Sequence, residues 1–533
     1  MNNLEDFKQA ELPVPANMAL RLFKPEPSFV RYKVNVLIDR SGEEGTPVVF
    51  ETNPNVLNLI GKIEYRFQMG MALTDFTLIK SGALHKANGG YLILDALDVF
   101  KNPFSYDILK RAIKNKEIRI EDPLEPYRMS SGTLKPEPIP LDIKITIIGN
   151  PFIYYILYNY DEEFSKIFKV KVDFERDILW DEKGEATYAF YINYLVEKEN
   201  LLPFDDSAIQ RVIEYGGRLI DDQKRLSIKV EDIAELVRES SFFAKKANKN
   251  LVTKEDVILA LTKKKERHNK VERRIQEQFV RDILLVSTEG SKVGVINGLS
   301  VYDLGDYRFG RPSRITATVY AGKSGVVHID REAKLSGKIH DKASMIIASY
   351  FNNKFGKKNT LNFSANICFE QLYGMIEGDS ASVAEVVVLH SAIGNIPIKQ
   401  SIAVTGSINQ YGEVQPIGGV NEKIEGFFEV VKERGFKEKE TGVIIPKSNI
   451  QNLMLNEEVC EAVKKGIFHI YAIENVEEAL EILMGFKAGS YDETKDSYEE
   501  GSINFFVYKN LSLLKEKNKE EKKGSLKEKK KNE

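Results

Sequence analysis

The sequence predicts a multidomain α/β protein in which two α/β layers flank a helix-rich segment. The chain has 533 residues, which is more than one hydrophobic core normally accommodates. Short apolar runs alternate with helical patterns over residues 53–175 and again beyond residue 286, whereas residues 186–262 are helical in character. We therefore expect an α/β layer, a helical domain and a second α/β domain, in that order.

In the first layer, residues 91–94 and 143–148 are apolar runs short enough to be buried strands, and residues 106–115 between them have a helical pattern. Upstream, apolar residues at 34, 36 and 38 alternate with polar ones, apart from Leu37, and end at a Gly- and Ser-containing turn at 41–45. This pattern predicts one further strand ahead of the layer.

The second half of the chain has clearer periodicity. Residues 230–246 form an amphipathic helical pattern, Thr253 followed by acidic residues begins another helix, and residues 263–274 are a charge-dense helical connector. We then expect strands at 293–304, 314–321, 326–330 and 361–369, with helices at 341–352, 380–392 and 419–434. Residues 515–533 carry almost only polar residues and are predicted to be disordered.

Composition limits the classes of function. With 76 basic and 79 acidic residues the net charge is −3, which provides no general attraction for nucleic acid. No apolar run approaches the length of a membrane span, the N-terminus has no signal-peptide pattern, and two cysteines make no disulfide framework. The six histidines contain no His-x-x-x-His pair, so we predict no metal site and a cytoplasmic protein.

One candidate nucleophile is Ser380, within Gly-Asp-Ser-Ala-Ser at 378–382. The segment follows an alternating strand and precedes an apolar helix, so free backbone N–H groups at the helix start could hold an oxyanion in front of the hydroxyl. Asp and Ser are also ordinary helix caps, which is the alternative interpretation. Ser382 stands where the elbow of α/β-hydrolases has its second glycine, which argues against that fold.

Lys423 is the candidate base for this serine. It lies on the same helical stripe as Val420 and Ile424, and a lysine facing a core has a lowered pKa that allows its neutral amine to accept a proton. The alternative is a lysine at the edge of the stripe with its amine in water. His390 is ten residues beyond Ser380 on one helix, about 15 Å away and too far to act, whereas His340 stays open.

Together these segments resemble the proteolytic domain of Lon proteases, most closely the archaeal or B-type branch. The resemblance covers residues 290–485 and is carried by the segments 294–299, 309–315, 337–342, 377–382 and 416–423. It implies that Ser380 is the nucleophile, that Lys423 is the base and that Thr405 lies near the lysine amine. The implied reaction is acyl transfer through an acyl-enzyme. Asp379 could pair with Lys423 in a resting form, and a permanent pair would leave a catalytically silent scaffold.

Residues 51–262 resemble the AAA+ module of the same branch, through the segments 53–55, 59–64, 82–90, 92–98 and 145–150. The resemblance makes Asp95 the Mg²⁺ ligand of a Walker B strand and Asn150 the sensor of the γ-phosphate, with ATP-Mg²⁺ as cofactor. The chain has no Gly-x4-Gly-Lys-Ser/Thr phosphate loop, however, and the one Gly-Lys ahead of Asp95 is Gly61-Lys62. Asp95 and Asn150 would then belong to a degenerate nucleotide site.

We therefore expect five regions. They are an N-terminal remnant (1–50), a partial AAA+ α/β subdomain (51–185), a helical lid with its connector (186–275), a Lon proteolytic domain (276–488) and a charged, disordered tail (489–533). The predicted function is a Lon-like serine endopeptidase that cleaves unfolded or damaged proteins as a homo-hexamer without its own ATP hydrolysis. The alternative is an ATP-dependent Lon protease whose phosphate loop is missing or supplied by a companion ATPase polypeptide. We expect no membrane partner and no DNA binding.

Overall fold

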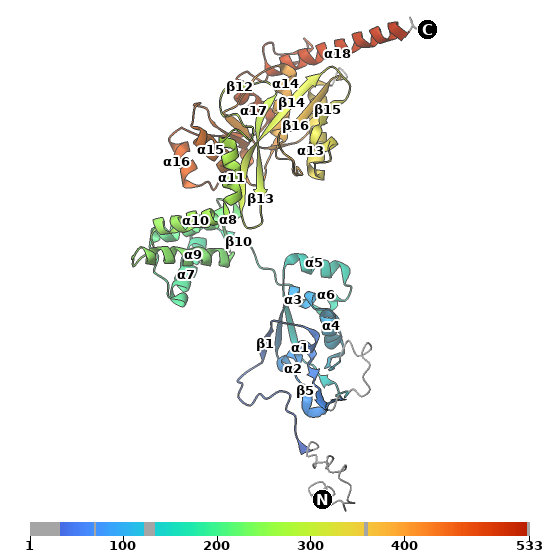
Figure 1. The fold of residues 1–533 in the computed structure, drawn as a ribbon, viewed down its shortest axis with the longest axis vertical. Helices are drawn as coiled ribbons and strands as arrows, with labels where there is room; N and C mark the ends of the chain where they lie inside the picture. The colour runs from blue at the N-terminus through green and yellow to red at the C-terminus, as the bar shows by residue number, and fades with distance from the viewer. Residues whose placement is uncertain (1–31, 69–70, 122–133, 357–360, 530–533) are drawn as a thin grey trace, which may run out of the picture. The chain divides into compact units, whose positions relative to one another are not determined.

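The computed structural model describes residues 32–68, 71–121, 134–356 and 361–529 (Figure 1). The chain divides into two compact units, Met1–Asp173 and Phe174–Glu533, which are described separately below. In the described part of the chain, the helices are too short or too polar for any of them to cross a membrane.

The first unit is built on a three-stranded parallel sheet of order β1-β6-β9 (Val48–Glu51, Tyr91–Asp95 and Lys144–Ile148). Leu92 and Leu94 of β6 are fully buried because β6 is the central strand, and they pack with Leu59, Leu84 and Leu109 from the helices. These helices and their neighbours are α1 (Val56–Ile60), α2 (Ala83–Ala87), α3 (Ala96–Lys101), α4 (Ser105–Asn115), α5 (Pro151–Tyr160) and α6 (Phe164–Ile167).

Short antiparallel pairs complete this unit. They are β2 with β5 (Lys62–Ile63 and Ile79–Lys80), β3 with β4 (Arg66–Gln68 and Met71–Leu73) and β7 with β8 (Glu117–Ile118 and Ile139–Pro140), and a 3-10 turn, η4, spans Phe76–Leu78.

Two predictions for this unit are wrong. Residues 34–38 form no strand; Val34 and Val36 are 85% and 67% exposed, and it is the Asn35 side chain that bonds to the Phe76 and Ile79 carbonyls. The strand expected at 143–148 exists as β9, but it is not buried, and Ile148 is 53% exposed. β9 is an outer strand of its sheet, so it lacks the two covered faces that an all-apolar run suggested.

The second unit begins with a helical part. It contains β10 (Asp177–Leu179) paired with β11 (Arg225–Ser227), and the helices α7 (Glu182–Glu199), α8 (Asp206–Ile220), α9 (Val230–Lys246), α10 (Lys254–His268) and α11 (Lys270–Val280). The helix α9 has the predicted bounds, and Thr253 caps α10 through a capping box with Asp256. The charge-dense connector is helical but consists of two helices that meet at Asn269.

A mixed seven-stranded sheet of order β15-β16-β14-β13-β18-β21-β22 follows in this unit (Figure 1). Its strands are β13 (Val295–Asp303), β14 (Arg308–Tyr320), β15 (Gly325–His328), β16 (Ser364–Phe369), β18 (Ile402–Val404), β21 (Gly442–Pro446) and β22 (His469–Ile473). β13, β18, β21 and β22 are parallel to one another, and β14 is antiparallel to both of its neighbours. Each strand predicted for this domain is present, with small shifts in its ends except for β14, which begins at Arg308 rather than at the predicted residue 314.

The core of this domain is centred on α14 (Ser382–Gly394), of whose 13 residues all but one are buried. The other helices are α12 (Ile329–Glu332), α13 (Lys338–Phe355), α15 (Val420–Arg434), α16 (Glu457–Lys464) and α17 (Val476–Met484), with a 3-10 turn η6 (Lys447–Asn452). Two further pairs are β12 with β17 (Ser291–Lys292 and Ile398–Lys399) and β19 with β20 (Ser407–Ile408 and Val414–Gln415).

The expectation of a disordered tail at 489–533 is wrong for residues 489–529, and residues 530–533 lie outside the described residues. The chain there forms the pair β23 and β24 (Tyr491–Asp492 and Ser497–Tyr498) and the long helix α18 (Ile503–Lys529), which packs on α14. Ile503, Val507 and Leu511 recur every four residues and are buried in the same core as α14. This apolar stripe precedes the lysine-rich end that dominated the composition, and its burial stabilises the start of the helix.

The helical part is docked on the helix α15 of the second α/β domain. Arg218 of α8 donates both terminal guanidinium nitrogens to Glu425 at 3.0 Å, and its Nη2 lies 3.5 Å from Glu422. Asn421 donates to the Asp221 carboxylate at 2.7 Å, at the C-terminal end of α8. These contacts tie the helical part to the first turns of α15.

Candidate active site

Ser380 lies two residues ahead of α14, in the loop that follows β16. Its backbone carbonyl accepts hydrogen bonds from the Gly406 N–H at 2.8 Å and from the Thr405 hydroxyl at 3.1 Å, both beyond the carboxyl end of β18. The Ser382 hydroxyl donates to the Asp379 carbonyl at 2.7 Å. The turn is therefore held on both sides of Ser380, and Ser380 itself is only partly buried, so a substrate can reach it.

The amide groups of this turn are available as donors. In the described ranges, the backbone N–H groups of Ser380 and Ala381 donate to no protein acceptor, and α14 has no side-chain cap at its start. Free N–H groups at the N-terminus of a buried helix can stabilise a developing negative charge.

Lys423 occupies the first turn of α15 and points to the serine. Its Nζ donates a hydrogen bond of 2.8 Å to Ser380 Oγ and another of 3.1 Å to Thr405 Oγ1. The side chain is 3% exposed, so it is not a lysine at the solvent edge of the helix. The three residues expected to meet at this site, Ser380, Lys423 and Thr405, are thus in mutual contact.

Burial sets the ionisation of this lysine. It lowers the pKa of Lys423 to about 8, because the charged amine loses its hydration, while the negative charges of Asp379 and Glu422 oppose the shift. About a tenth of the amine is therefore neutral at pH 7, far more than for an exposed lysine, and the neutral form is the one that acts as a base.

Two glycines allow α15 to lie against the sheet at this point. A Cβ on Gly310 of β14 would lie 2.0 Å from the Glu422 carbonyl oxygen, and one on Gly426 would lie 2.0 Å from the Gly310 carbonyl oxygen. The backbones of β14 and α15 are therefore in direct contact on either side of Lys423. Gly310 lies in the segment 309–315, but nothing in the sequence indicated that this glycine packs against a helix.

Asp379 does not pair with Lys423 in this structure. Its carboxylate accepts a hydrogen bond of 2.7 Å from the Ser407 hydroxyl on β19. Sequence reasoning missed Ser407, because a serine in a short strand is indistinguishable from many others. The contact directs the Asp379 carboxylate toward β19, although its charge still acts on the lysine.

The residues of the expected nucleotide site lie at the ends of neighbouring parallel strands in the first unit. Asp95 ends β6 and accepts from the Asp98 N–H at 3.2 Å, and Asn150 follows β9 and accepts from the Phe152 N–H at 2.8 Å. Each side chain is therefore engaged as the cap of its own following helix.

The segment Gly61-Lys62 does not fit a phosphate-binding loop. Gly61 ends α1 with φ +84°, and Lys62 enters β2 and pairs with Glu64 at 2.8 Å, so a helix leads into a strand. A phosphate loop has the reverse order, strand to helix, with its amides and lysine free for the phosphates. The described residues therefore do not fit an ATP-Mg²⁺ site of the P-loop type.

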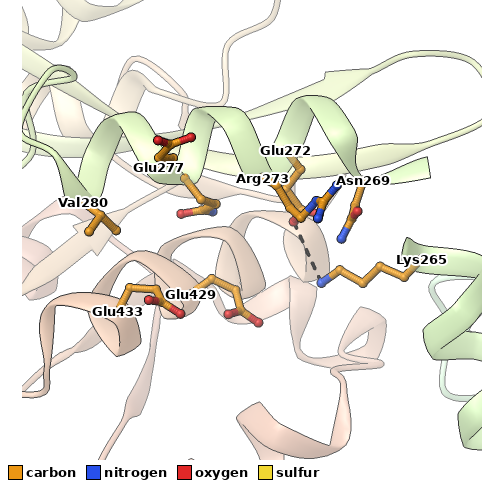
Figure 2. A pocket seen from close by; sticks show the side chains of 9 residues that line it. Lys265, Asn269, Glu272, Arg273, Glu277, Val280, Glu429 and Glu433 are labelled. Atoms are coloured by element: carbon orange, nitrogen blue, oxygen red, sulfur yellow. Dashed lines mark ion pairs between the residues drawn. The ribbon is translucent and has the colours of Figure 1, made fainter. Parts of the chain in front are cut away.

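One pocket of the second unit lies away from Ser380. Figure 2 shows it between α11 and α15, lined largely by charged side chains, with an ion pair of 3.9 Å between Lys265 and Glu272. Neither Ser380 nor Lys423 lines it. No serine, threonine or cysteine lines it, and it is not part of the candidate active site.

A partly exposed serine bonded to a buried lysine of lowered pKa, beside free amides of a helix N-terminus, defines a serine hydrolase of the lysine-assisted class. Comparison with family models identifies the domains. Residues 277–485 match the Lon protease (S16) C-terminal proteolytic domain, residues 44–175 match the LonB-like AAA domain, and residues 203–267 match the archaeal LonB AAA+ ATPase LID domain.

Individual relatives agree with these matches. The chain is 34% identical over 424 residues to a Lon protease homolog of Haemophilus influenzae, covering 78% of this chain and 68% of the relative. It is 31% identical over 415 residues to a Lon protease homolog of Escherichia coli, covering 77% and 69% respectively, and 29% identical over 438 residues to an archaeal Lon protease of Thermoplasma volcanium, covering 79% and 64%. The chain belongs to the Lon protease family and is a serine endopeptidase.

Proposed function

We propose that Ser380 and Lys423 form the catalytic dyad of this endopeptidase, with Thr405 positioning the lysine amine. The observation that carries the proposal is the 2.8 Å hydrogen bond between Lys423 Nζ and Ser380 Oγ, made by a lysine that is 3% exposed. A buried amine at this distance accepts the hydroxyl proton once it is neutral.

The reaction follows from these contacts. Neutral Lys423 takes the Ser380 proton as Oγ attacks the peptide carbonyl, and the N–H groups of Ser380 and Ala381 stabilise the oxyanion. The C–N bond then breaks, and the protonated lysine gives its proton to the leaving amine. Water, deprotonated by Lys423, hydrolyses the resulting ester and restores the serine. The Thr405 hydroxyl accepts from Nζ at 3.1 Å and keeps the amine directed at Oγ.

We propose that the substrates are unfolded or damaged proteins and that the active form is a homo-hexamer. Membership of the Lon family supports both proposals. A ring that encloses its active sites would admit extended chains and exclude folded ones, since the reacting peptide bond must come within bonding distance of Ser380 Oγ.

We further propose that this chain cleaves peptide bonds without hydrolysing ATP itself. The support is the conformation of Gly61-Lys62, which leads from α1 into β2, and the engagement of Asp95 and Asn150 as helix caps. The competing function is ATP-dependent proteolysis with a phosphate loop from a companion ATPase polypeptide. Tight binding of ATP-Mg²⁺ to the purified chain alone would contradict our proposal.

The experiment is degradation of an unfolded model protein with and without ATP-Mg²⁺, comparing the wild type with Ser380→Ala. Ser382→Ala is the matched control, because its hydroxyl is committed to the Asp379 carbonyl. We expect equal wild-type rates with and without nucleotide, loss of activity in Ser380→Ala, and a modest effect in Ser382→Ala. Degradation by Ser380→Ala at the wild-type rate would reject the dyad, and a wild type inactive under all conditions would favour the silent scaffold.

A further inference from the structure

Three ionisable side chains with metal-binding atoms meet in the interior of the protease domain, outside the catalytic contacts. His328 ends β15, His340 is in the first turn of α13, and Glu385 is in the first turn of α14. Their exposed fractions are 1%, 1% and 0%. Because α13 packs against both β15 and α14, residues up to 57 positions apart in the sequence converge at one point.

The spacing of their donor atoms suits one small cation. One ligand atom from each residue lies within 4.8 Å of the others, and His328 Nδ1 is 3.2 Å from Glu385 Oε2. Tetrahedral Zn²⁺ with bonds of about 2.0–2.1 Å holds its ligand atoms roughly 3.3 Å apart. The His328–Glu385 pair already has this spacing.

These atoms are poorly satisfied by protein partners. Both ring nitrogens of His328 and His340 and both carboxylate oxygens of Glu385 are buried without a well-formed hydrogen bond in the described part of the chain, apart from the close approach of His328 to Glu385 and a contact of His340 with the Gly378 backbone. Leaving one buried polar group unpaired costs about 1–3 kcal/mol. A cluster of this size therefore indicates a ligand that the protein itself does not supply.

Burial keeps the side chains of the cluster uncharged in the absence of a ligand. Burial raises the pKa of Glu385 to about 8 and lowers the pKa of His328 to about 3, so the two are a neutral pair rather than an ion pair. Burial lowers the pKa of His340 as well, partly offset by the Gly378 backbone and nearby carboxylates. Neutral imidazole is the form that binds metal, and Glu385 would become a ligand by losing its proton.

Charged groups around the cluster balance a divalent ion. The negative charge of Asp330 in α12 acts on both Glu385 and His340, and its Oδ2 accepts from the Phe369 N–H at 3.1 Å. The negative charges of Asp341 and Glu377 raise the pKa values of the histidines, whereas the positive charge of Arg331 lowers the pKa of His328. With Glu385 and Asp330 ionised, a divalent cation would be neutralised locally.

We propose that His328, His340 and Glu385 bind one divalent transition-metal ion of the zinc type, at a structural site separate from Ser380 and Lys423. Two imidazoles and one carboxylate are a common donor set for zinc. The ion would connect β15, α13 and α14, the helix that follows the Ser380 turn. The predicted effect is on folding stability.

The test is the zinc content of the purified full-length chain after stripping with a chelator, reloading with ZnCl₂ and dialysis. We expect about one zinc ion per chain, a melting temperature that rises with zinc concentration, and loss of both effects in Glu385→Gln and in His328→Gln. His390→Gln is the matched control, because His390 is a fully buried histidine of the same helix outside the cluster. It should retain the zinc.

A second measurement needs no variant. Co²⁺ added to the stripped wild type should give the intense visible bands of a tetrahedral site. No retained zinc and no such spectrum would overturn the proposal and leave a buried pair in which neutral Glu385 donates to His328. Zinc retained equally by Glu385→Gln and His328→Gln would also overturn it, because the ion would then be bound elsewhere.

Discussion

The two α/β regions of this chain place their motif residues at comparable positions but with different partners. Asp95 and Asn150 stand at the carboxyl ends of neighbouring strands, and each caps the helix that follows it. Ser380 and Lys423 come from separate helix starts, and their reactive atoms are 2.8 Å apart with the lysine buried. The comparison shows that motif residues become reactive only where another reactive side chain lies within hydrogen-bonding distance and burial shifts a pKa.

The largest expected effect is the loss of activity when the Ser380 hydroxyl is removed. Ser380→Ala should lower kcat for peptide hydrolysis by about 10³-fold or more, since nothing else in the site can form the acyl-enzyme. The check is steady-state kinetics on a fluorogenic peptide, with unchanged thermal unfolding as the control for folding. A loss of less than about tenfold would mean that another group performs the attack.

Close packing of α15 on β14 is the next feature to break. Gly426→Ala should destabilise the protein by about 1–3 kcal/mol and lower activity, because the new methyl group would overlap the Gly310 carbonyl and displace the helix that carries Lys423. Urea unfolding and peptidase rates measure the two effects. Gly374→Ala, which has open space around its Cβ, is the control and should behave as the wild type.

Removing the buried amine should stabilise the protein while abolishing activity. Burial lowers the pKa of Lys423 from 10.5 to about 8, so burying the charged amine destabilises the folded state by about 3 kcal/mol. This destabilisation is complete below pH 8, where the amine is charged in both the folded and the unfolded chain. Between the two pKa values the unfolded chain binds the extra proton, so wild-type stability recovers as pH rises. The loss of the lysine's hydrogen bonds offsets part of this gain, so Lys423→Met should raise the free energy of unfolding by ~1–2 kcal/mol at pH 7, as measured in urea. The increase should shrink toward pH 10. A constant loss of stability across this range would contradict the lowered pKa.

Thr405 should have a smaller effect. Thr405→Val keeps the shape of the side chain but removes the acceptor for Lys423 and the donor to the Ser380 carbonyl. We expect kcat to fall about fivefold with KM unchanged, in line with the loss of about 1 kcal/mol of hydrogen bonding. Thr405→Ser, which keeps the hydroxyl, should retain most of the wild-type rate. If Thr405→Val and Thr405→Ser had identical kinetics, the hydroxyl of Thr405 would have no role at the site.

The sequence predicts that Ser380 and Lys423 meet, as they do in the structure, because its motifs are specific. Ser380 and Lys423 are 43 positions apart, yet the helix start after a strand and the apolar stripe around the lysine each indicate a role. The direction of the Asp379 carboxylate depends on a side-chain rotamer and on Ser407, neither of which leaves a sequence pattern.

Long-range convergence is what the sequence analysis missed. His328, His340 and Glu385 have no metal-ligand spacing in the chain and meet only through tertiary packing. The apolar stripe of α18 at Ile503, Val507 and Leu511 was visible in the sequence but was outweighed by the lysines that follow it. The exposure of β9 depends on its place at the edge of the sheet, which local pattern does not encode.

The smallest expected effect concerns the first unit. ATP-Mg²⁺ at millimolar concentration should change the melting temperature of the purified chain by less than about 1 °C, because a ligand stabilises a fold only in proportion to its binding. Differential scanning fluorimetry measures this shift. A rise of several degrees would remove the contrast between the two regions and restore a nucleotide site at Asp95 and Asn150.

The central claim is tested most directly by the rate at which a serine-directed phosphonate reagent labels Ser380 as a function of pH. The account predicts labelling that increases about tenfold per pH unit and levels off near pH 8, where Lys423 becomes neutral, with the modified residue identified as Ser380 by mass spectrometry. In Lys423→Met the labelling should be lost at every pH. Labelling that is independent of pH, or that persists in Lys423→Met at the wild-type rate, would contradict the account.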